Sequence, residues 1–284
     1  MRTNQNIPFL AAFSGIVSVQ TGAAFAKTLF PVVGSEGVAA LRLGISAVIL
    51  FLIFRPWTWT LRQSGISYGA ITLYGVVLAL MNLLIYRAFA YIPVSIAISI
   101  EVMGPLTAAL LTSRQKTDLL WILLSAIGMF LLAAGDINNT IDIRGVAYSV
   151  AAALFWGIYV IVGKKVSGGG GRSVAAGMLI AALIAVPLGT AQAGVALLAP
   201  EVLLTGLCVA LLSSMLPFLL DVYAMRWLPS RVFGVLLSGS PAVSALAGWI
   251  ILHEELSLTQ CGGILSVMAA CAGCALFARP RTLS

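Results

Sequence analysis

Long apolar segments follow one another along the chain, separated by short polar breaks that often contain Gly or Pro. A helix of about 20 apolar residues spans the roughly 30 Å hydrocarbon core of a bilayer. The pattern predicts ten such helices, over residues 7–30, 37–54, 66–87, 92–112, 119–135, 145–163, 173–190, 201–224, 230–251 and 258–278. The first is longer than the apolar region of a signal peptide and lacks a convincing cleavage site, so we expect it to be retained. The chain is therefore predicted to be an all-α integral membrane protein.

Composition favours the same fold class. Of the 284 residues, 61% are hydrophobic and 9% are charged, and the mean hydropathy is +1.07. Soluble domains carry about 25% charged residues. Ten spans use nearly the whole chain, so we expect a lipid bilayer around it and no sizeable soluble domain.

The basic residues predict the orientation, because Lys and Arg near span ends favour the cytoplasmic side. With a cytoplasmic N-terminus, most of them lie inside: Arg2, Arg55, Arg62, Arg114, Lys116, Lys164, Lys165, Arg172, Arg226, Arg231, Arg279 and Arg281. The outer side then receives Glu36, Asp136, Asp142, Glu201, Glu254 and Glu255, with Arg144 as its one clearly basic loop residue. Both termini are expected in the cytoplasm. No basic stretch extends beyond a short loop, so the net charge of +7 does not indicate a nucleic-acid partner.

The chain contains an internal repeat. The segment "YIPVSIAISIEVMGPLTAAL" at 91–110 aligns without gaps with "WLPSRVFGVLLSGSPAVSAL" at 227–246, an offset of 136 residues. Lys27 and Lys164 correspond at nearly the same offset. Two five-helix units follow, at 1–140 and 141–284. Because five is odd, the second unit is expected upside down relative to the first, which is an inverted-repeat architecture typical of transporters.

Three prolines within the predicted spans are candidate hinges: Pro105, Pro217 and Pro241. A proline removes a backbone hydrogen bond and bends its helix. Membrane helices also tolerate single prolines without a functional reason. Pro105 and Pro241 occupy matched positions in the two repeats, and this favours a paired bend.

Glu101 is the main candidate for a functional charge. It lies eight residues beyond Pro93, which places it about 12 Å into the membrane by helical rise. Two interpretations stand: a carboxylate that faces a cavity and handles substrate or protons, or a structural partner of Lys27, Arg42 or Arg87. Its counterpart in the second repeat is Leu237, so the site is expected to be asymmetric.

Other intramembrane polar and aromatic residues could line a pocket for an amphipathic small molecule. They are Gln20, Asn82, Tyr86, Trp156, Tyr159, Ser238 and Ser240. With Glu101 they predict a central cavity lined from spans one, three, four, six, eight and nine. Taken singly, each also fits helix-to-helix hydrogen bonding or interfacial anchoring. Asp221, five residues before Arg226, fits an interfacial ion pair better than transport chemistry.

No motif for an enzyme, a metal or a cofactor is found. The stretch "GIYVIVGKK" at 157–165 has the wrong glycine spacing for a phosphate-binding loop and lies in an apolar span. Cys271 and Cys274 lie on a membrane helix among small residues, and His253 lacks the second histidine of a zinc motif. We therefore expect no catalytic residues and no cofactor.

Three segments carry a family resemblance: "AAFAKTLFPVVGSEGVAALRL" at 23–43, "ISIEVMGPLTAAL" at 98–110 and "FWGIYVIVGKK" at 155–165. They resemble the EamA family of the drug/metabolite transporter superfamily, and within it the bacterial exporters of threonine and homoserine or of aromatic amino acids. The resemblance implies ten helices, an inner-membrane location, cytoplasmic termini and export of amino acids or similar metabolites. An exporter of cationic drugs or of another metabolite, such as a nucleotide sugar, is the alternative. The oligomeric state stays open.

The predicted orientation can be tested by labelling. In a variant whose four native cysteines are replaced by alanine, Asn138→Cys should react with a membrane-impermeant maleimide added to intact cells. Gly169→Cys, in the predicted cytoplasmic connector, should react only after the cells are opened. Labelling of residue 138 from the cytoplasmic side alone would refute the predicted topology.

Overall fold

The computed structural model describes residues 6–58, 66–112, 118–133, 141–217, 220, 223–224 and 236–277. All the secondary structure in these ranges is helical. The elements are α1 (Asn6–Thr28), α2 (Phe30–Phe54), η1 (Pro56–Thr58), α4 (Tyr68–Phe89), α5 (Val94–Glu101), α6 (Met103–Thr112), α7 (Asp118–Ala133), α8 (Ile143–Val166), η2 (Ser167–Gly169), α9 (Gly171–Ala193), η3 (Gly194–Leu198), α10 (Pro200–Ala210), η4 (Leu211–Met215), α13 (Ser240–Ala247), η5 (Gly248–Leu252) and α14 (Leu258–Phe277).

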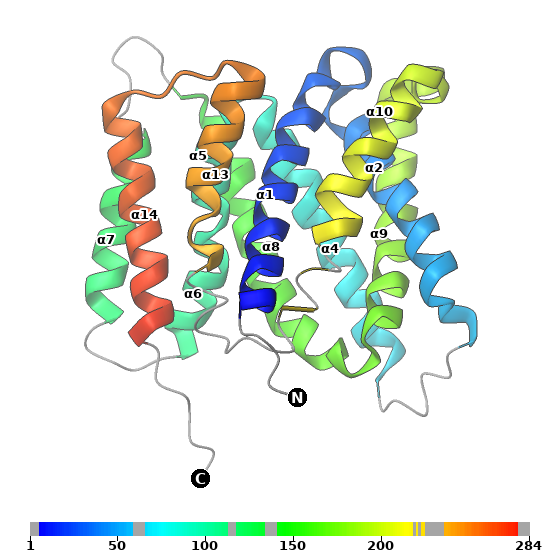
Figure 1. Ribbon diagram of the computed structural model, residues 1–284, viewed down its shortest axis with the longest axis horizontal. Helices are drawn as coiled ribbons and strands as arrows, with labels where there is room; N and C mark the ends of the chain where they lie inside the picture. Colours follow the sequence, from blue (N-terminus) through cyan, green and yellow to red (C-terminus); the bar gives the residue numbers. More distant parts are fainter. Residues whose placement is uncertain are drawn as a thin grey trace.

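The helices run along a common direction in one bundle, and α1 begins at the same end at which α14 finishes (Figure 1). Five of them are long and apolar enough to cross a membrane: Ile7–Thr28, Phe30–Phe54, Tyr68–Phe89, Ile143–Gly163 and Gly171–Leu198. Five shorter apolar helical stretches lie at the other predicted spans: Val94–Thr107, Leu120–Leu132, Pro200–Met215, Ser240–Leu252 and Leu258–Gly273. The expectation of an all-helical, multi-pass membrane chain is confirmed.

One boundary differs clearly from the sequence prediction. α2 begins at Phe30, before the predicted start at residue 37, because Pro31 opens a short helical turn. Gly34 then interrupts the helix with a φ of 70°. The Gln192 side chain caps the part that follows, since its Oε1 accepts hydrogen bonds from the backbone N–H of Glu36 at 2.8 Å and of Gly37 at 3.2 Å.

Each of the two matched prolines follows a break in its helix. The predicted fourth span is divided at Val102 into α5 and α6. Pro105 has no N–H to donate to the carbonyl of Glu101, four residues earlier. In the second half of the chain, the turn at Ser238 and Gly239 precedes α13, which Pro241 opens near its first position. Both helices are thus interrupted just before the matched prolines, while a bend or hinge at these points stays a prediction.

Pro217 lies close to a different distortion. Residues Leu211–Met215 form a π-helical turn, η4, directly after α10. A second π-helical turn, η5, follows α13. Such turns shift the backbone hydrogen bonds of a helix and often mark functional sites.

Small residues allow the helices to approach closely, as is usual in membranes. α2 packs on α9, α4 on α8 and α7 on α14. A Cβ placed on Gly128 would lie 3.0 Å from the carbonyl of Gly263, and one on Gly263 would lie 2.9 Å from the carbonyl of Gly128. α6 meets α8 even more tightly, since a Cβ on Gly104 would lie 1.9 Å from the carbonyl oxygen of Ala153.

Gly104→Ala should therefore destabilise the protein. The added methyl group meets backbone and must push α6 away from α8, an overpacking that costs about 1–3 kcal/mol. Gly69→Ala is the matched control, because a Cβ there meets nothing within 4 Å. Thermal unfolding in detergent should show a lower melting temperature for Gly104→Ala alone, and equal values for both variants would contradict the packing described here.

Candidate functional site

The π-helical turn η4 makes backbone carbonyls available to side chains of α1 and α2. Pro217 offers no N–H to the carbonyl of Ser213, four residues before it. Side chains bond three carbonyls of this stretch: Ser18 Oγ donates to Leu212 O at 2.7 Å, Arg42 Nη2 to Ser213 O at 3.1 Å and Ser46 Oγ to Ala210 O at 3.3 Å. Hydrogen bonds from neighbouring helices thereby satisfy these backbone carbonyls, as a membrane interior requires.

Arg42 is the buried cation of this region. Its side chain is 8% exposed, its Nε donates to Ser214 Oγ at 2.7 Å, and its guanidinium carbon lies 5.1 Å from the centre of the Tyr86 ring. A guanidinium carries five N–H groups. Two are bonded here, and the other three find no acceptor within the described ranges.

Glu101 is the buried carboxylate, at the last residue of α5 and 7% exposed. In the part of the chain that the structure describes, it forms no hydrogen bond and no ion pair within 4 Å. Lys27 pairs instead with Glu254, and Arg87 with Glu36. Arg42, the third candidate cation, also lies more than 4 Å from the carboxylate.

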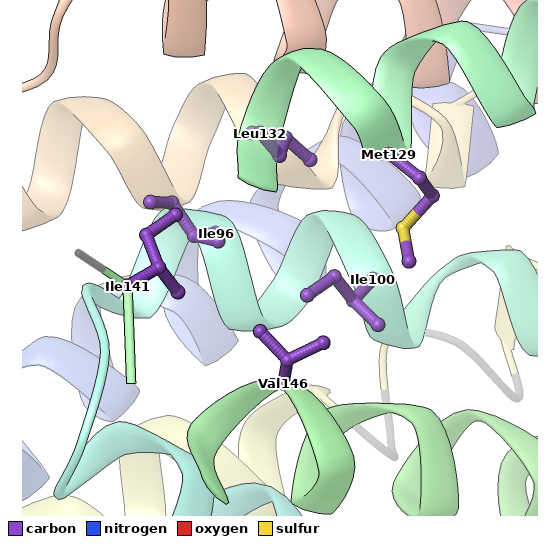
Figure 2. Close-up of a pocket in the computed structure, with 6 residues that line it drawn as sticks. All are labelled: Ile96, Ile100, Met129, Leu132, Ile141 and Val146. Atoms are coloured by element: carbon purple, nitrogen blue, oxygen red, sulfur yellow. The ribbon is translucent and has the colours of Figure 1, made fainter. Parts of the chain in front are cut away.

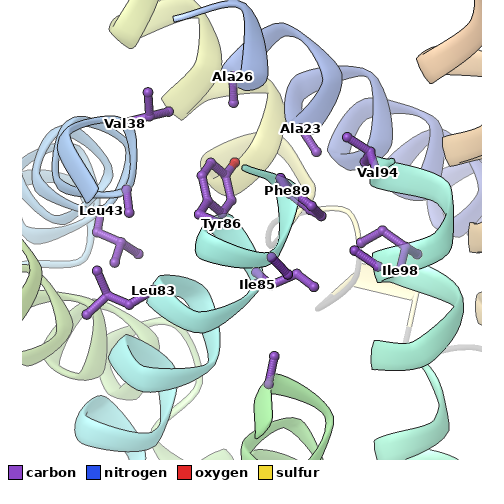
Figure 3. Close-up of a cluster of buried hydrophobic side chains, with 14 of the residues drawn as sticks. Ala23, Ala26, Val38, Leu43, Leu83, Ile85, Tyr86, Phe89, Val94 and Ile98 are labelled. Carbon is purple, nitrogen blue, oxygen red and sulfur yellow. The ribbon is translucent and has the colours of Figure 1, made fainter. Parts of the chain in front are cut away.

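Gln20, Asn82 and Tyr86 are also buried, at 5%, 4% and 1% exposure. Asn82 Nδ2 donates to the carbonyl of Leu78 within its own helix at 2.8 Å. Gln20 Oε1 and the Tyr86 hydroxyl have no hydrogen-bond partner. Figure 3 shows the Tyr86 ring beside Phe89, with its hydroxyl directed toward the side of the cluster where α1 and α2 lie.

Tyr159 contacts a tyrosine of a neighbouring helix. Its hydroxyl lies 2.9 Å from the hydroxyl of Tyr74, and the two rings stack with centres 5.0 Å apart. Both rings pack in a small cluster with Ile71 and Val162. This contact joins α4 and α8, and the predicted substrate-lining role of Tyr159 stays a prediction. Trp156, one turn away on α8, is half-buried against the main core.

Ser238 and Ser240 are buried at the break before α13. α13 packs against both α1, which carries Gln20, and α5, which ends at Glu101. Asp221 and Arg226 lie outside the described residues. Within the described ranges, no three His, Cys, Asp or Glu side chains come together to hold a metal ion.

One pocket lies between α5, α7 and α8, and Figure 2 shows its lining. The residues that form it are Ile96, Ile100, Met129, Leu132, Ile141 and Val146. It offers no polar group for an amino acid, so it is not the predicted substrate site. The central cavity stays a prediction.

A second polar cluster, which the sequence did not single out, closes the end of the bundle opposite the start of α1. Lys27 Nζ lies 2.7 Å from Glu254 Oε1 and donates to the carbonyl of Ile92 at 3.2 Å. Glu254 also accepts the N–H of Val94 at 3.0 Å, at the first residue of α5. A carboxylate at a helix N-terminus is favoured by the unpaired N–H groups and the helix dipole. One ion pair thus ties α1, α5 and the segment after η5 together.

Arg87 and Glu36 form a second ion pair at this end. The Arg87 guanidinium also lies 5.8 Å from the centre of the Tyr148 ring on α8. The two ion pairs account for Lys27 and Arg87, two of the three cations that could have neutralised Glu101. The available sequence signal for Glu254 was its position at the outer end of a predicted span, the same end at which Lys27 is expected.

Comparisons with known proteins place these features in a family. The model of the EamA-like transporter family matches residues 143–276. The threonine/homoserine exporter RhtA of Salmonella typhimurium strain LT2 is 39% identical over 275 residues, which cover 96% of this chain and 92% of the relative. RhtA of Escherichia coli K12 is 40% identical over the same shares. One solved crystal structure is 15% identical in sequence, and the alignment covers 96% of this chain and 99% of that chain. The TM-score of 0.66 shows a shared fold.

The Glu254 cluster generates a stability prediction. Glu254→Ala leaves the part-buried Lys27 without its partner and the N–H of Val94 unbonded, which should cost about 1–3 kcal/mol. Glu255→Ala, at the exposed neighbour, should change the melting temperature little. Adding Lys27→Met to Glu254→Ala should cost less than the sum of the single changes. Equal effects of the two glutamate variants would argue against the cluster.

Proposed function

The chain belongs to the EamA-like transporter family, and on this premise we propose that it exports threonine, homoserine and related amino acids across the bacterial inner membrane. The observation that carries the proposal is the similarity to threonine/homoserine exporters, 39–40% identical over 96% of this chain. The polar interior around Arg42 and Glu101 is consistent with a small polar substrate. No nucleotide-binding motif is recognisable in the sequence, so we expect the gradient of the substrate or of an ion to drive transport.

We propose that residues 1–140 and 141–284 are two inverted repeats. The offset of 136 residues supports this, and so does the pairing of helices. Exchange of the halves replaces α1 by α8, α2 by α9, α4 by α10 and η4, α5 by α13, and α7 by α14. The contact of α4 with α8 then corresponds to that of η4 with α1, and the contact of α5 with α8 corresponds to that of α13 with α1. α4 with α9 corresponds to α10 with α2, while α2 with α9, α5 with α13 and α7 with α14 map onto themselves. Exchange of the two halves leaves this set of contacts unchanged, as expected for a pseudo-two-fold axis.

We further propose that both termini are cytoplasmic, which makes the end that carries Lys27 and Glu254 the outer end. The concentration of Lys and Arg in the loops at the other end supports this orientation. Substrate would then pass between the repeats by alternating access, with the breaks before Pro105 and Pro241 and the turn before Pro217 as hinges. The proposed lining of the path is the predicted set of Gln20, Asn82, Tyr86, Glu101, Trp156, Tyr159, Ser238 and Ser240.

The transport assay uses the purified protein in liposomes loaded with radiolabelled threonine. Efflux should exceed that of protein-free liposomes and should saturate with threonine concentration. Unlabelled homoserine loaded with the threonine should compete, whereas a nucleotide sugar or a cationic dye should not. Efflux of the dye or the nucleotide sugar without efflux of any amino acid would replace this proposal with one of the alternative substrates.

A further inference from the structure

The interior of the bundle holds two buried opposite charges that are not in contact. Arg42 keeps three N–H groups without an acceptor, and Glu101 has no partner, within the described ranges. Gln20 Oε1 and the Tyr86 hydroxyl are unbonded as well. Buried polar groups are nearly always hydrogen-bonded, and a buried charge without a partner is costly. Four such groups in one region indicate a polar ligand.

The folding pattern brings these groups to one depth. Ala23 of α1 and Ile98 of α5 lie in the same buried cluster with Tyr86 (Figure 3). α1 and α5 run in opposite directions (Figure 1). Gln20 lies three residues before Ala23, and Glu101 lies three residues after Ile98. Because the two helices are antiparallel, each residue lies about one turn further along the bundle in the same direction, on the face of its helix that carries Ala23 or Ile98.

Arg42 reaches the same region from α2. Its guanidinium lies over the Tyr86 ring, and Leu43, its neighbour in sequence, packs in the cluster that contains Ala23 and Ile98. Its hydrogen bonds to Ser213 and Ser214 are made by Nη2 and Nε. These bonds fix the guanidinium and leave Nη1 free to bind a ligand.

The lack of direct contact between the two charges is what a bridging amino acid requires. An α-amino acid carries its ammonium and carboxylate on one carbon, with bonds of about 1.5 Å on either side. Adding a charge-assisted hydrogen bond of about 2.8 Å at each end gives a bridge of several ångströms. Two side chains in direct ion-pair contact would exclude such a bridge, whereas Arg42 and Glu101 lie more than 4 Å apart.

We propose that Arg42 binds the carboxylate and Glu101 the ammonium group of one α-amino acid, with Gln20 Oε1 accepting a further ammonium hydrogen bond. Guanidinium N–H groups match a carboxylate well, and an ammonium group supplies three donors for the oxygens of Glu101 and Gln20. The inference rests on the proposed amino-acid export and assigns its recognition to named residues. Ser213 and Ser214 are positioning residues, since they act by holding Arg42.

The test measures how each side chain responds to removal of the ligand group that it binds. Dissociation constants of the purified protein are determined by calorimetry for threonine, threoninamide and 3-hydroxybutyrate; the amide lacks the carboxylate, and the acid lacks the amino group. The wild type should bind both analogues at least about tenfold more weakly than threonine, as expected for hydrogen bonds to charged groups.

Each variant should lose one discrimination and keep the other. Arg42→Gln should bind threonine and threoninamide equally and still reject 3-hydroxybutyrate. Glu101→Gln should bind threonine and 3-hydroxybutyrate equally and still reject threoninamide. Arg55→Gln, at an exposed arginine just after α2, and Glu255→Gln are the matched controls and should behave as the wild type. Arg42→Lys, which keeps the charge, is the second variant if Arg42→Gln does not fold, and it should show a reduced discrimination against the amide.

Retention of both discriminations by folded Arg42 and Glu101 variants overturns this inference while the proposed function stands. A wild type that neither binds nor transports any amino acid overturns the proposed function and the inference with it. A general loss of affinity for all three ligands, together with a lowered melting temperature, assigns Arg42 and Glu101 to structure and also overturns the inference.

Discussion

Inside a bilayer, a helix must satisfy its backbone hydrogen bonds without water, and each proline in a helix removes one of them. This constraint shapes the interior of the molecule. At Pro217 the carbonyl of Ser213 is free, and Arg42 bonds it from α2. A cation is thereby held in the middle of the bundle by a backbone defect. At Pro105 the helix stops at Glu101, so the two buried charges both lie next to places where a proline interrupts a helix.

The charged residues at one end of the bundle differ from those in its interior. Lys27 with Glu254 and Arg87 with Glu36 are ion pairs at one end of the bundle, and Glu254 also caps α5. They hold helices from distant parts of the sequence together. In the interior, Arg42 and Glu101 remain unpaired in the described part of the chain. The ion pairs at the end therefore hold helices together, whereas the described ranges give the two interior charges no such partner.

The breaks in the helices lie at corresponding positions in the two halves of the chain. The interruptions at Val102 and Ser238 lie 136 residues apart, the same offset as the repeated prolines. Because α5 and α13 pack on each other, a bend in one changes the surroundings of the other. Glu101, the last residue of α5, lies directly at one of these breaks.

The sequence by itself determined the helical class, the positions of the ten apolar segments and the paired breaks, because apolar length, composition and proline are local properties that a linear pattern records. It also identified Glu101, Gln20 and Tyr86 as polar groups within apolar spans. Only the tertiary structure decided their partners. Lys27 bonds Glu254, 227 residues away, rather than Glu101, and Arg42 bonds Ser214, 172 residues away. Tyr159, grouped with Trp156 by spacing, is held by Tyr74. Helical spacing shows which residues share a face, but which helices meet across that face depends on how small residues and breaks let the bundle pack.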